Sequence, residues 1–146
     1  MLIKNSKLKK GEIFMPKLLI PAIIFITLAL IFYTVGVWGE HRAKVLEKKH
    51  VIIFWCGLVC DTLGTFTMSR IAAAHADKTI TPIQLLIHQS TGMLAILLML
   101  FHAVWATWVL NKGSEKAKQA FHKFSMVVWV IWLIPYFVGM YIGMAG

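Results

Sequence analysis

Charged residues are scarce in this chain, and acidic residues are the scarcest of them. Asp and Glu number 6 among 146 residues, against 15 Lys and Arg, and all charged residues make up 14% of the sequence. Together with 59% hydrophobic residues, this excludes an ordinary soluble domain and indicates an integral membrane protein. A formal net charge of +9 is then typical of loops at an anionic membrane surface. The sequence has no basic patch interleaved with aromatic residues, which would indicate nucleic-acid binding.

Cysteine is nearly absent too, and so are the motifs of most enzyme classes. Cys56 and Cys60 stand four residues apart in an apolar stretch, where they form no disulfide framework and are expected to pack as small apolar residues. The sequence has no His-Glu-x-x-His zinc motif and no glycine-rich phosphate loop. These absences favour a binding or electron-transfer protein over an enzyme that turns over a substrate.

Four long apolar stretches predict four membrane-spanning helices. They cover residues 18–38, 51–68, 82–110 and 124–144. Pro82 suits the first turn of the third helix, and Pro135 predicts a kink in the fourth. The run 112–115, Lys-Gly-Ser-Glu, indicates a helix end followed directly by a helix start. The short connections predict an all-α, up-down-up-down four-helix bundle that forms one transmembrane domain over residues 15–146.

Residues 1–14 form a basic extension in front of this domain, and we expect them to be flexible. The two loops that follow the first and third spans are rich in basic residues, namely Arg42, Lys44, Lys48, Lys49, Lys112, Lys116, Lys118 and Lys123. The opposite side carries Lys17, Arg70 and Lys78 besides the extension. By the positive-inside rule, we expect a multi-pass protein of the cell membrane with loops one and three in the cytoplasm and both termini outside.

Histidines in or at the edge of the predicted spans are the main candidates for chemistry, because imidazole is rare in hydrocarbon. His88 and His102 share one face of the third span, and the steps along that face are 4, 3, 4 and 3 residues. The second span carries His50 and Asp61 on one face, and the fourth begins its inward face at His122. The small or soft residues on these faces are Gly57, Gly92, Ala95 and Met99. They are typical of close helix packing, but they would also leave room for a flat macrocycle.

Depth along the bundle divides these histidines into two groups. Counting from the Gly113–Ser114 turn places His102 and His122 within about 4.5 Å of one another along the axis. His50 begins the second span on the same side. All three are therefore candidate axial ligands of a haem iron, with His122 paired to His102 by depth or to His50 by its diagonal position. The sequence leaves both pairings open.

His88 and Asp61 form the outer group and are expected to face each other at similar depth. Three hypotheses remain open for them. Asp61 orients His88 as a metal ligand, or the two form a bridge or proton relay without metal, or Asp61 lines a polar cavity. His41 and His75 fall in predicted loops, where we expect them to be solvated.

Three stretches of the chain resemble a known family. They are KKHVIIFWCGLVCDTLGT at 48–65, IHQSTGMLAILLMLFHAVWATWVL at 87–110 and FHKFSMVVWVIWLIPYFVGM at 121–140. They are similar to the HsmA-type small four-helix haem-binding membrane proteins, over about residues 15–144. The resemblance implies a membrane protein that sequesters haem and protects the cell against haem and oxidative stress. It implies no ligand assignment.

Four hypotheses for function follow. The first is a b-type haem protein that holds one or two haem b groups by axial histidines and sequesters them. The second is a transmembrane electron-transfer or quinone-linked oxidoreductase with a redox partner, in which haems stack at His88 and His102, about 21 Å apart along the helix. The third is a proton or metal transporter that uses Asp61 and His88 and works as a homo-oligomer. The fourth is a scaffold whose histidines are core residues.

Overall fold

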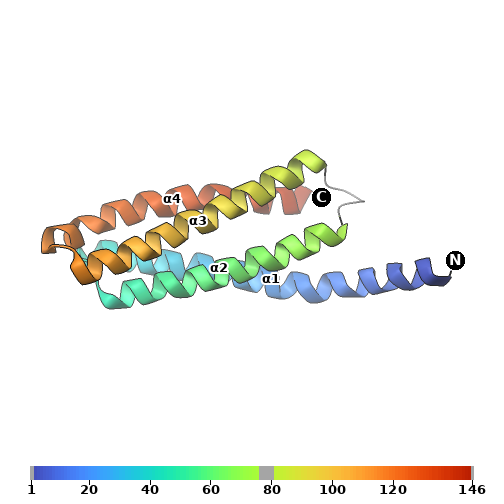
Figure 1. The fold of residues 1–146 in the computed structure, drawn as a ribbon, viewed down its shortest axis with the longest axis horizontal. Helices are drawn as coiled ribbons and strands as arrows, with labels where there is room; N and C mark the ends of the chain where they lie inside the picture. The colour runs from blue at the N-terminus through green and yellow to red at the C-terminus, as the bar shows by residue number, and fades with distance from the viewer. Residues whose placement is uncertain (1, 76–80, 146) are drawn as a thin grey trace.

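The computed structural model describes the backbone of residues 2–75 and 81–145, and the side chains of residues 17–74, 81–142 and 144. Its elements are four helices (Figure 1): α1 (Leu2–Ala43), α2 (Lys48–His75), α3 (Pro82–Lys112) and α4 (Glu115–Ala145). Each contains a stretch long and apolar enough to cross a membrane; these stretches are 17–43, 48–74, 82–112 and 115–142. The all-helical fold class and the four apolar spans are therefore confirmed.

The four helices lie side by side around one core. α1 packs against α2 and α4, and α3 packs against the same two helices, with the closest packing between α1 and α2. The α1–α2 and α3–α4 connections lie together at one end of the bundle, which we call the loop end (Figure 1). The end of α2 and the start of α3 lie at the other end, which we call the far end.

The short loop between α1 and α2 ends the first helix without glycine. Lys44 adopts a φ of 60°, and its N–H donates to the carbonyl of Glu40 at 2.9 Å, which closes the last turn of α1. Two residues later, the N–H of Leu46 donates to the carbonyl of Lys118 at 3.1 Å. This bond ties the first loop to α4, so the two loops at this end are held together.

The predicted starts of α3 and α4 are confirmed by their caps. Thr81 and Gln84 form a reciprocal capping box at the start of α3, and Pro82 occupies the first helical position. At the start of α4, the Ser114 hydroxyl accepts a hydrogen bond from the N–H of Ala117 at 3.2 Å. α4 then continues without a break through the proline that the sequence marked as a kink.

Three helix boundaries differ from those predicted. α1 continues to Ala43 instead of ending near residue 38, and α2 continues to His75 instead of ending near residue 68. The backbone is also helical from Leu2, so the extension expected to be flexible continues α1. The reason is that hydropathy marks where apolar surface ends, whereas good helix formers such as lysine, leucine and alanine extend a helix beyond that point.

The buried core lies toward the loop end. The fully buried large side chains are Tyr33, Val37, Glu40, Leu46, His50, Phe54, Met99, His102 and Ser125. Among the described residues, no side chain of α3 before Ala95 and none of α4 after Trp132 is buried. Many large apolar side chains instead cover the outside of the bundle, as expected for a surface that faces lipid.

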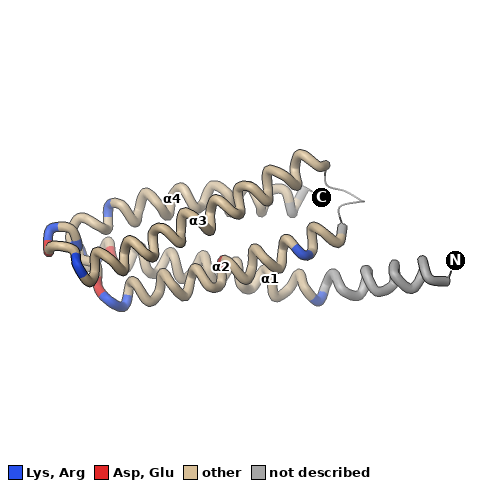
Figure 2. Tube along the Cα trace, viewed as in Figure 1, with Lys and Arg blue, Asp and Glu red and all other residues tan. Residues whose placement is uncertain are grey.

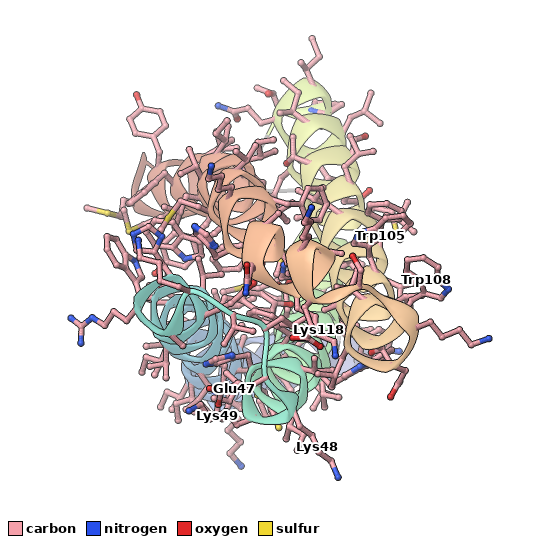
Figure 3. All side chains as sticks on the ribbon, turned by 90° about the vertical axis from the view of Figure 1, so that its left-hand side faces the viewer. Glu47, Lys48, Lys49, Trp105, Trp108 and Lys118 are labelled. Atoms are coloured by element: carbon pink, nitrogen blue, oxygen red, sulfur yellow. The ribbon has the colours of Figure 1, made fainter. Side chains whose placement is uncertain are left out.

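Basic residues also concentrate at the loop end (Figure 2). Seen from that end, Glu47, Lys48 and Lys49 gather at the start of α2, and Lys118 lies nearer the centre of the bundle (Figure 3). Lys49 Nζ lies 2.7 Å from Glu47 Oε2, and this bond holds the pKa of the Glu47 carboxyl below its usual range. Trp105 and Trp108 project outward from α3, in the manner of an interfacial aromatic belt.

Candidate functional site

His122 is held at the interface of α1 and α4 with one ring nitrogen fixed. Its Nδ1 lies 2.6 Å from the carbonyl oxygen of Gln119, one turn earlier in α4. A carbonyl only accepts hydrogen bonds, so Nδ1 must carry a hydrogen, and in the neutral ring the lone pair is then on Nε2. An imidazole oriented in this way by a backbone carbonyl is the usual state of a histidine that ligates a metal.

His41 of α1 lies directly beside His122. The two ring centroids are 5.4 Å apart, with the ring planes inclined at 64°. The Nδ1 atom of His41 is buried and has no hydrogen-bond partner among the described residues. The expectation that His41 is a solvated loop residue is therefore wrong, because α1 continues beyond it to Ala43.

The signal that could have placed His41 in a helix was present in the sequence. Tyr33, Val37 and Glu40 are all fully buried, and their spacing of 4 and 3 residues continues one helical face past the predicted end of the span. Hydropathy alone ends the predicted span before Glu40, because that residue is charged. His75, the other histidine expected in a loop, is the last residue of α2, and its side chain lies outside the described residues.

Two tryptophans extend the α1–α4 interface from this histidine pair. The Trp38 ring lies 5.9 Å from the ring of His41 and 6.3 Å from that of Trp129, between centroids. The indole N–H of Trp129 donates to the hydroxyl of Thr34 at 3.3 Å, which fixes it between the two helices. The interface therefore places two imidazoles next to two indoles, and we call His41, His122, Trp38 and Trp129 the α1–α4 site.

His50 and His102 are buried, but other contacts occupy them. His50 Nδ1 accepts the N–H of Glu47 at 3.1 Å, so its Nε2 carries the hydrogen of the neutral ring. His102 Nε2 lies 2.9 Å from the hydroxyl of Ser125, and its ring stacks on Phe121 at 5.5 Å. Phe121 directly precedes His122, so this stacking agrees with the predicted similar depth of His102 and His122.

The predicted inner histidines therefore lie at one end of the bundle, and each makes different contacts there. Within the described side chains, no group of three or more His, Cys, Asp or Glu residues is arranged to hold a metal ion. The ring hydrogen bond of His122 places its hydrogen on Nδ1, and the ring beside it is that of His41.

The small residues expected to make room for a macrocycle serve helix packing. A Cβ atom at Gly57 would lie 2.5 Å from the ring of Tyr33, which fills the space that this glycine leaves. Gly92 faces Thr65 of α2 at ordinary contact distance, and Ala95 and Met99 are buried in the core. The close-packing alternative is thus the one that the structure supports at these positions.

Asp61 and His88 are not paired, contrary to the expectation. The Oδ2 atom of Asp61 accepts hydrogen bonds from the Trp132 indole at 3.0 Å and from the Tyr33 hydroxyl at 3.3 Å. The Gly92–Thr65 contact sets the relative level of α3 and α2. Asp61 lies four residues from Thr65 toward the loop end, and His88 lies four residues from Gly92 toward the far end. The two side chains are therefore about 12 Å apart along the bundle axis.

The extra length of α2 explains this error. The second span was predicted to end at residue 68, but α2 runs on to residue 75, so Asp61 lies deeper in the bundle than predicted. His88 packs against α4 instead. A Cβ atom at Gly139 would lie 3.0 Å from His88 Cε1, so this glycine gives the imidazole its space.

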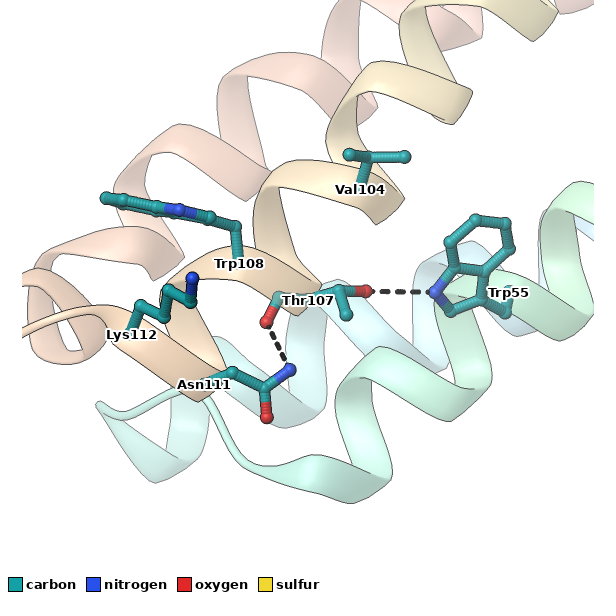
Figure 4. A pocket seen from close by; sticks show the side chains of 6 residues that line it. All are labelled: Trp55, Val104, Thr107, Trp108, Asn111 and Lys112. Carbon is teal, nitrogen blue, oxygen red and sulfur yellow. Dashed lines mark hydrogen bonds between the residues drawn. The ribbon is translucent and has the colours of Figure 1, made fainter.

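A separate cavity of about 300 Å³ lies on the outer surface between α2 and α3 (Figure 4). Its lining residues are Trp55, Val104, Thr107, Trp108, Asn111 and Lys112. Trp55 donates its indole N–H to the Thr107 hydroxyl at 3.0 Å, and the Asn111 amide donates to the Thr107 carbonyl at 2.9 Å. This cavity contains no histidine, so it is distinct from the α1–α4 site.

Comparisons with protein-family models, with curated proteins and with solved structures found no match. The chemistry of the site is therefore argued from its own residues. Haem iron accepts imidazole nitrogens as axial ligands. The α1–α4 site brings together two adjacent imidazoles, with the Nδ1 of His122 on the Gln119 carbonyl and the Nδ1 of His41 buried and unpartnered among the described residues.

Proposed function

We propose that this chain is an integral membrane protein that binds haem b at the α1–α4 site and sequesters it. In this proposal the helices cross the membrane in up-down-up-down order, with the loop end in the cytoplasm. The observation that carries the proposal is the histidine pair. His122 has its Nδ1 fixed by the Gln119 carbonyl, and His41 lies 5.4 Å away between ring centroids.

The chain's own residues have distinct roles in this proposal. His122 would hold the haem through Nε2, because the Gln119 carbonyl sets its tautomer and its orientation. His41 would hold it as well, and Trp38 and Trp129 would supply aromatic surface beside it. Bound haem would supply a redox-active iron.

Sequestration follows from the number of ligands. Two imidazoles would hold the haem, and a haem iron held by two protein ligands would be poorly open to a substrate. A haem held in this way at a membrane site is kept from reacting freely. The proposal therefore favours protection against haem and oxidative stress over turnover of a substrate.

The test is the visible spectrum of the purified protein, oxidised and dithionite-reduced, with haem per chain measured as the pyridine haemochrome. We expect one haem per chain, with sharp reduced α and β bands. His122→Ala should abolish binding of added hemin or weaken it at least tenfold, and His41→Ala should convert the spectrum to that of a five-coordinate haem. His50→Gln is the matched control, since its ring is committed to Glu47, and it should keep the haem.

Two results would overturn the proposal. One is a protein that stays free of haem and shows no spectral change on titration with hemin. The other is full haem content with an unchanged spectrum in both the His122→Ala and the His41→Ala variants.

A second candidate is an electron-transfer protein with two haems. The observation that favours it is the position of His88, which packs over Gly139 toward the far end. There, α3 before Ala95 and α4 after Trp132 bury no side chain among the described residues. A ratio near two haems per chain that falls to one in His88→Ala would support it. A ratio near one that His88→Ala leaves unchanged would exclude it.

A further inference from the structure

A second polar cluster lies in the core at the loop end, separate from the α1–α4 site. It takes one side chain from each helix: Glu40 from α1, His50 from α2, His102 from α3 and Ser125 from α4. Their exposed fractions are 0%, 2%, 0% and 0%, respectively. Polar side chains buried this completely in an apolar bundle need hydrogen-bond partners.

Contacts in the structure bring these four side chains together. His102 and Ser125 are hydrogen-bonded at 2.9 Å. Ser125 lies beside the Glu40 carboxyl group, although not in the geometry of a hydrogen bond. His50 points its Nε2 at the backbone of Gly39, where a Cβ atom would lie 3.4 Å from that nitrogen, one residue before Glu40.

Four atoms of this cluster lack a hydrogen-bond partner among the described residues. They are Oε1 and Oε2 of Glu40, Nε2 of His50 and Nδ1 of His102. No Lys or Arg compensates Glu40, since the ion pairs within the described side chains join Lys49 to Glu47 and Lys118 to Glu115. A buried carboxyl group with neither counter-ion nor hydrogen bond is strongly disfavoured, so the site needs a further component.

The donors and acceptors decide what this component is. The Glu40 carboxyl group has an acceptor oxygen with or without a proton. The neutral His50 ring carries its hydrogen on Nε2 and donates from there, because Nδ1 already accepts from Glu47. A metal ion would need a lone pair at His50 Nε2, and the described residues contain no group arranged for a metal. Water both donates and accepts, and it bridges buried polar groups that cannot reach each other.

We propose that Glu40, His50, His102 and Ser125 form a binding site for ordered water inside the bundle. The water bridges the Glu40 carboxyl group to the two imidazoles, and the Ser125 hydroxyl continues the chain of hydrogen bonds to His102. This site does not depend on haem binding, because none of its four side chains is a ligand in the α1–α4 site.

The test is water-edited solid-state NMR on the purified protein in liposomes, with histidine and tryptophan labelled with ¹⁵N. Magnetisation that starts on water should reach the His50 and His102 rings at least fivefold faster than the Trp132 indole. That indole is the internal control, since it is equally buried but already donates to Asp61. The variants His50→Gln, His102→Gln and Trp132→Phe assign the three signals.

Glu40→Leu should slow the transfer to both imidazoles to the rate of the Trp132 indole, because it removes the acceptor that holds the water. If that variant does not fold, Glu40→Gln and Ser125→Ala replace it. The glutamine keeps an acceptor oxygen and should preserve fast transfer, whereas the alanine should slow transfer to His102. Transfer to both wild-type rings at the rate of Trp132, or fast transfer that survives loss of the acceptor at position 40, would overturn the proposal.

Discussion

At the scale of single residues, Asp61 shows how the bundle accommodates a carboxyl group in its core. Its Oδ2 accepts one hydrogen bond from α1, through Tyr33, and one from α4, through Trp132. The rings of those two donors also pack edge to face, with centroids 4.9 Å apart. Asp61 therefore links three helices, and its role is structural support instead of the orientation of a metal ligand.

Substitution of Asp61 should separate the loss of charge from the loss of acceptors. Asp61→Asn keeps an acceptor oxygen in place, and we expect the free energy of unfolding to change by less than about 1 kcal/mol. Asp61→Ala leaves two buried donors unpaired and should cost about 2–5 kcal/mol. Thermal unfolding in detergent measures both. Equal stability of the alanine and asparagine variants would contradict this role for Asp61.

At the scale of helices, α1 and α2 pack closely because glycines receive side chains from the opposite helix. A Cβ atom at Gly36 would meet the Phe54 ring at 2.6 Å, and one at Gly64 would meet the Ile26 side chain at the same distance. Each glycine thus leaves space for a large side chain of the opposite helix. This packing between small and large residues replaces the hydrophobic driving force that lipid does not supply.

Alanine substitution at two helix-face glycines provides a matched test of this packing. Gly57→Ala would place a methyl group 2.5 Å from the Tyr33 ring and push the tyrosine from Asp61, so we expect a loss of about 1–3 kcal/mol of stability. Gly92→Ala would meet only Thr65, at 3.5 Å, and should be neutral or slightly stabilising because it favours the helix. Unfolding temperatures measured side by side compare the two. A tolerated Gly57→Ala would argue against close α1–α2 packing.

The helices themselves could be predicted from the sequence, because long apolar runs and capping residues such as Thr81 and Ser114 are local signals. Helix length beyond the apolar run could not, and this is why His41 and Glu40 were missed and Asp61 was placed at the wrong depth. The groups that each imidazole contacts could not be predicted either. Periodicity fixes which residues share a face of one helix, but not how that face is turned toward the next helix.

At the scale of the whole molecule, the two ends of the bundle differ in charge and in packing. Basic residues and the α1–α2 and α3–α4 loops gather at the loop end, toward which the buried core also lies (Figures 2 and 3). Toward the far end, α3 before Ala95 and α4 after Trp132 bury no side chain among the described residues. The histidine pair and the polar cluster of the core are both near the end that we propose faces the cytoplasm.

Cysteine labelling tests this orientation in intact cells. In a background with Cys56→Ala and Cys60→Ala, Lys116→Cys places an exposed thiol at the loop end, and Met144→Cys places one near the end of α4. The basic loops should be retained in the cytoplasm by the positive-inside rule. A membrane-impermeant maleimide should therefore label Met144→Cys in intact cells and Lys116→Cys only after permeabilisation. The opposite pattern would place His41 and His122, the proposed haem ligands, near the outer surface. Labelling of both thiols in intact cells would mean that α4 does not span the membrane.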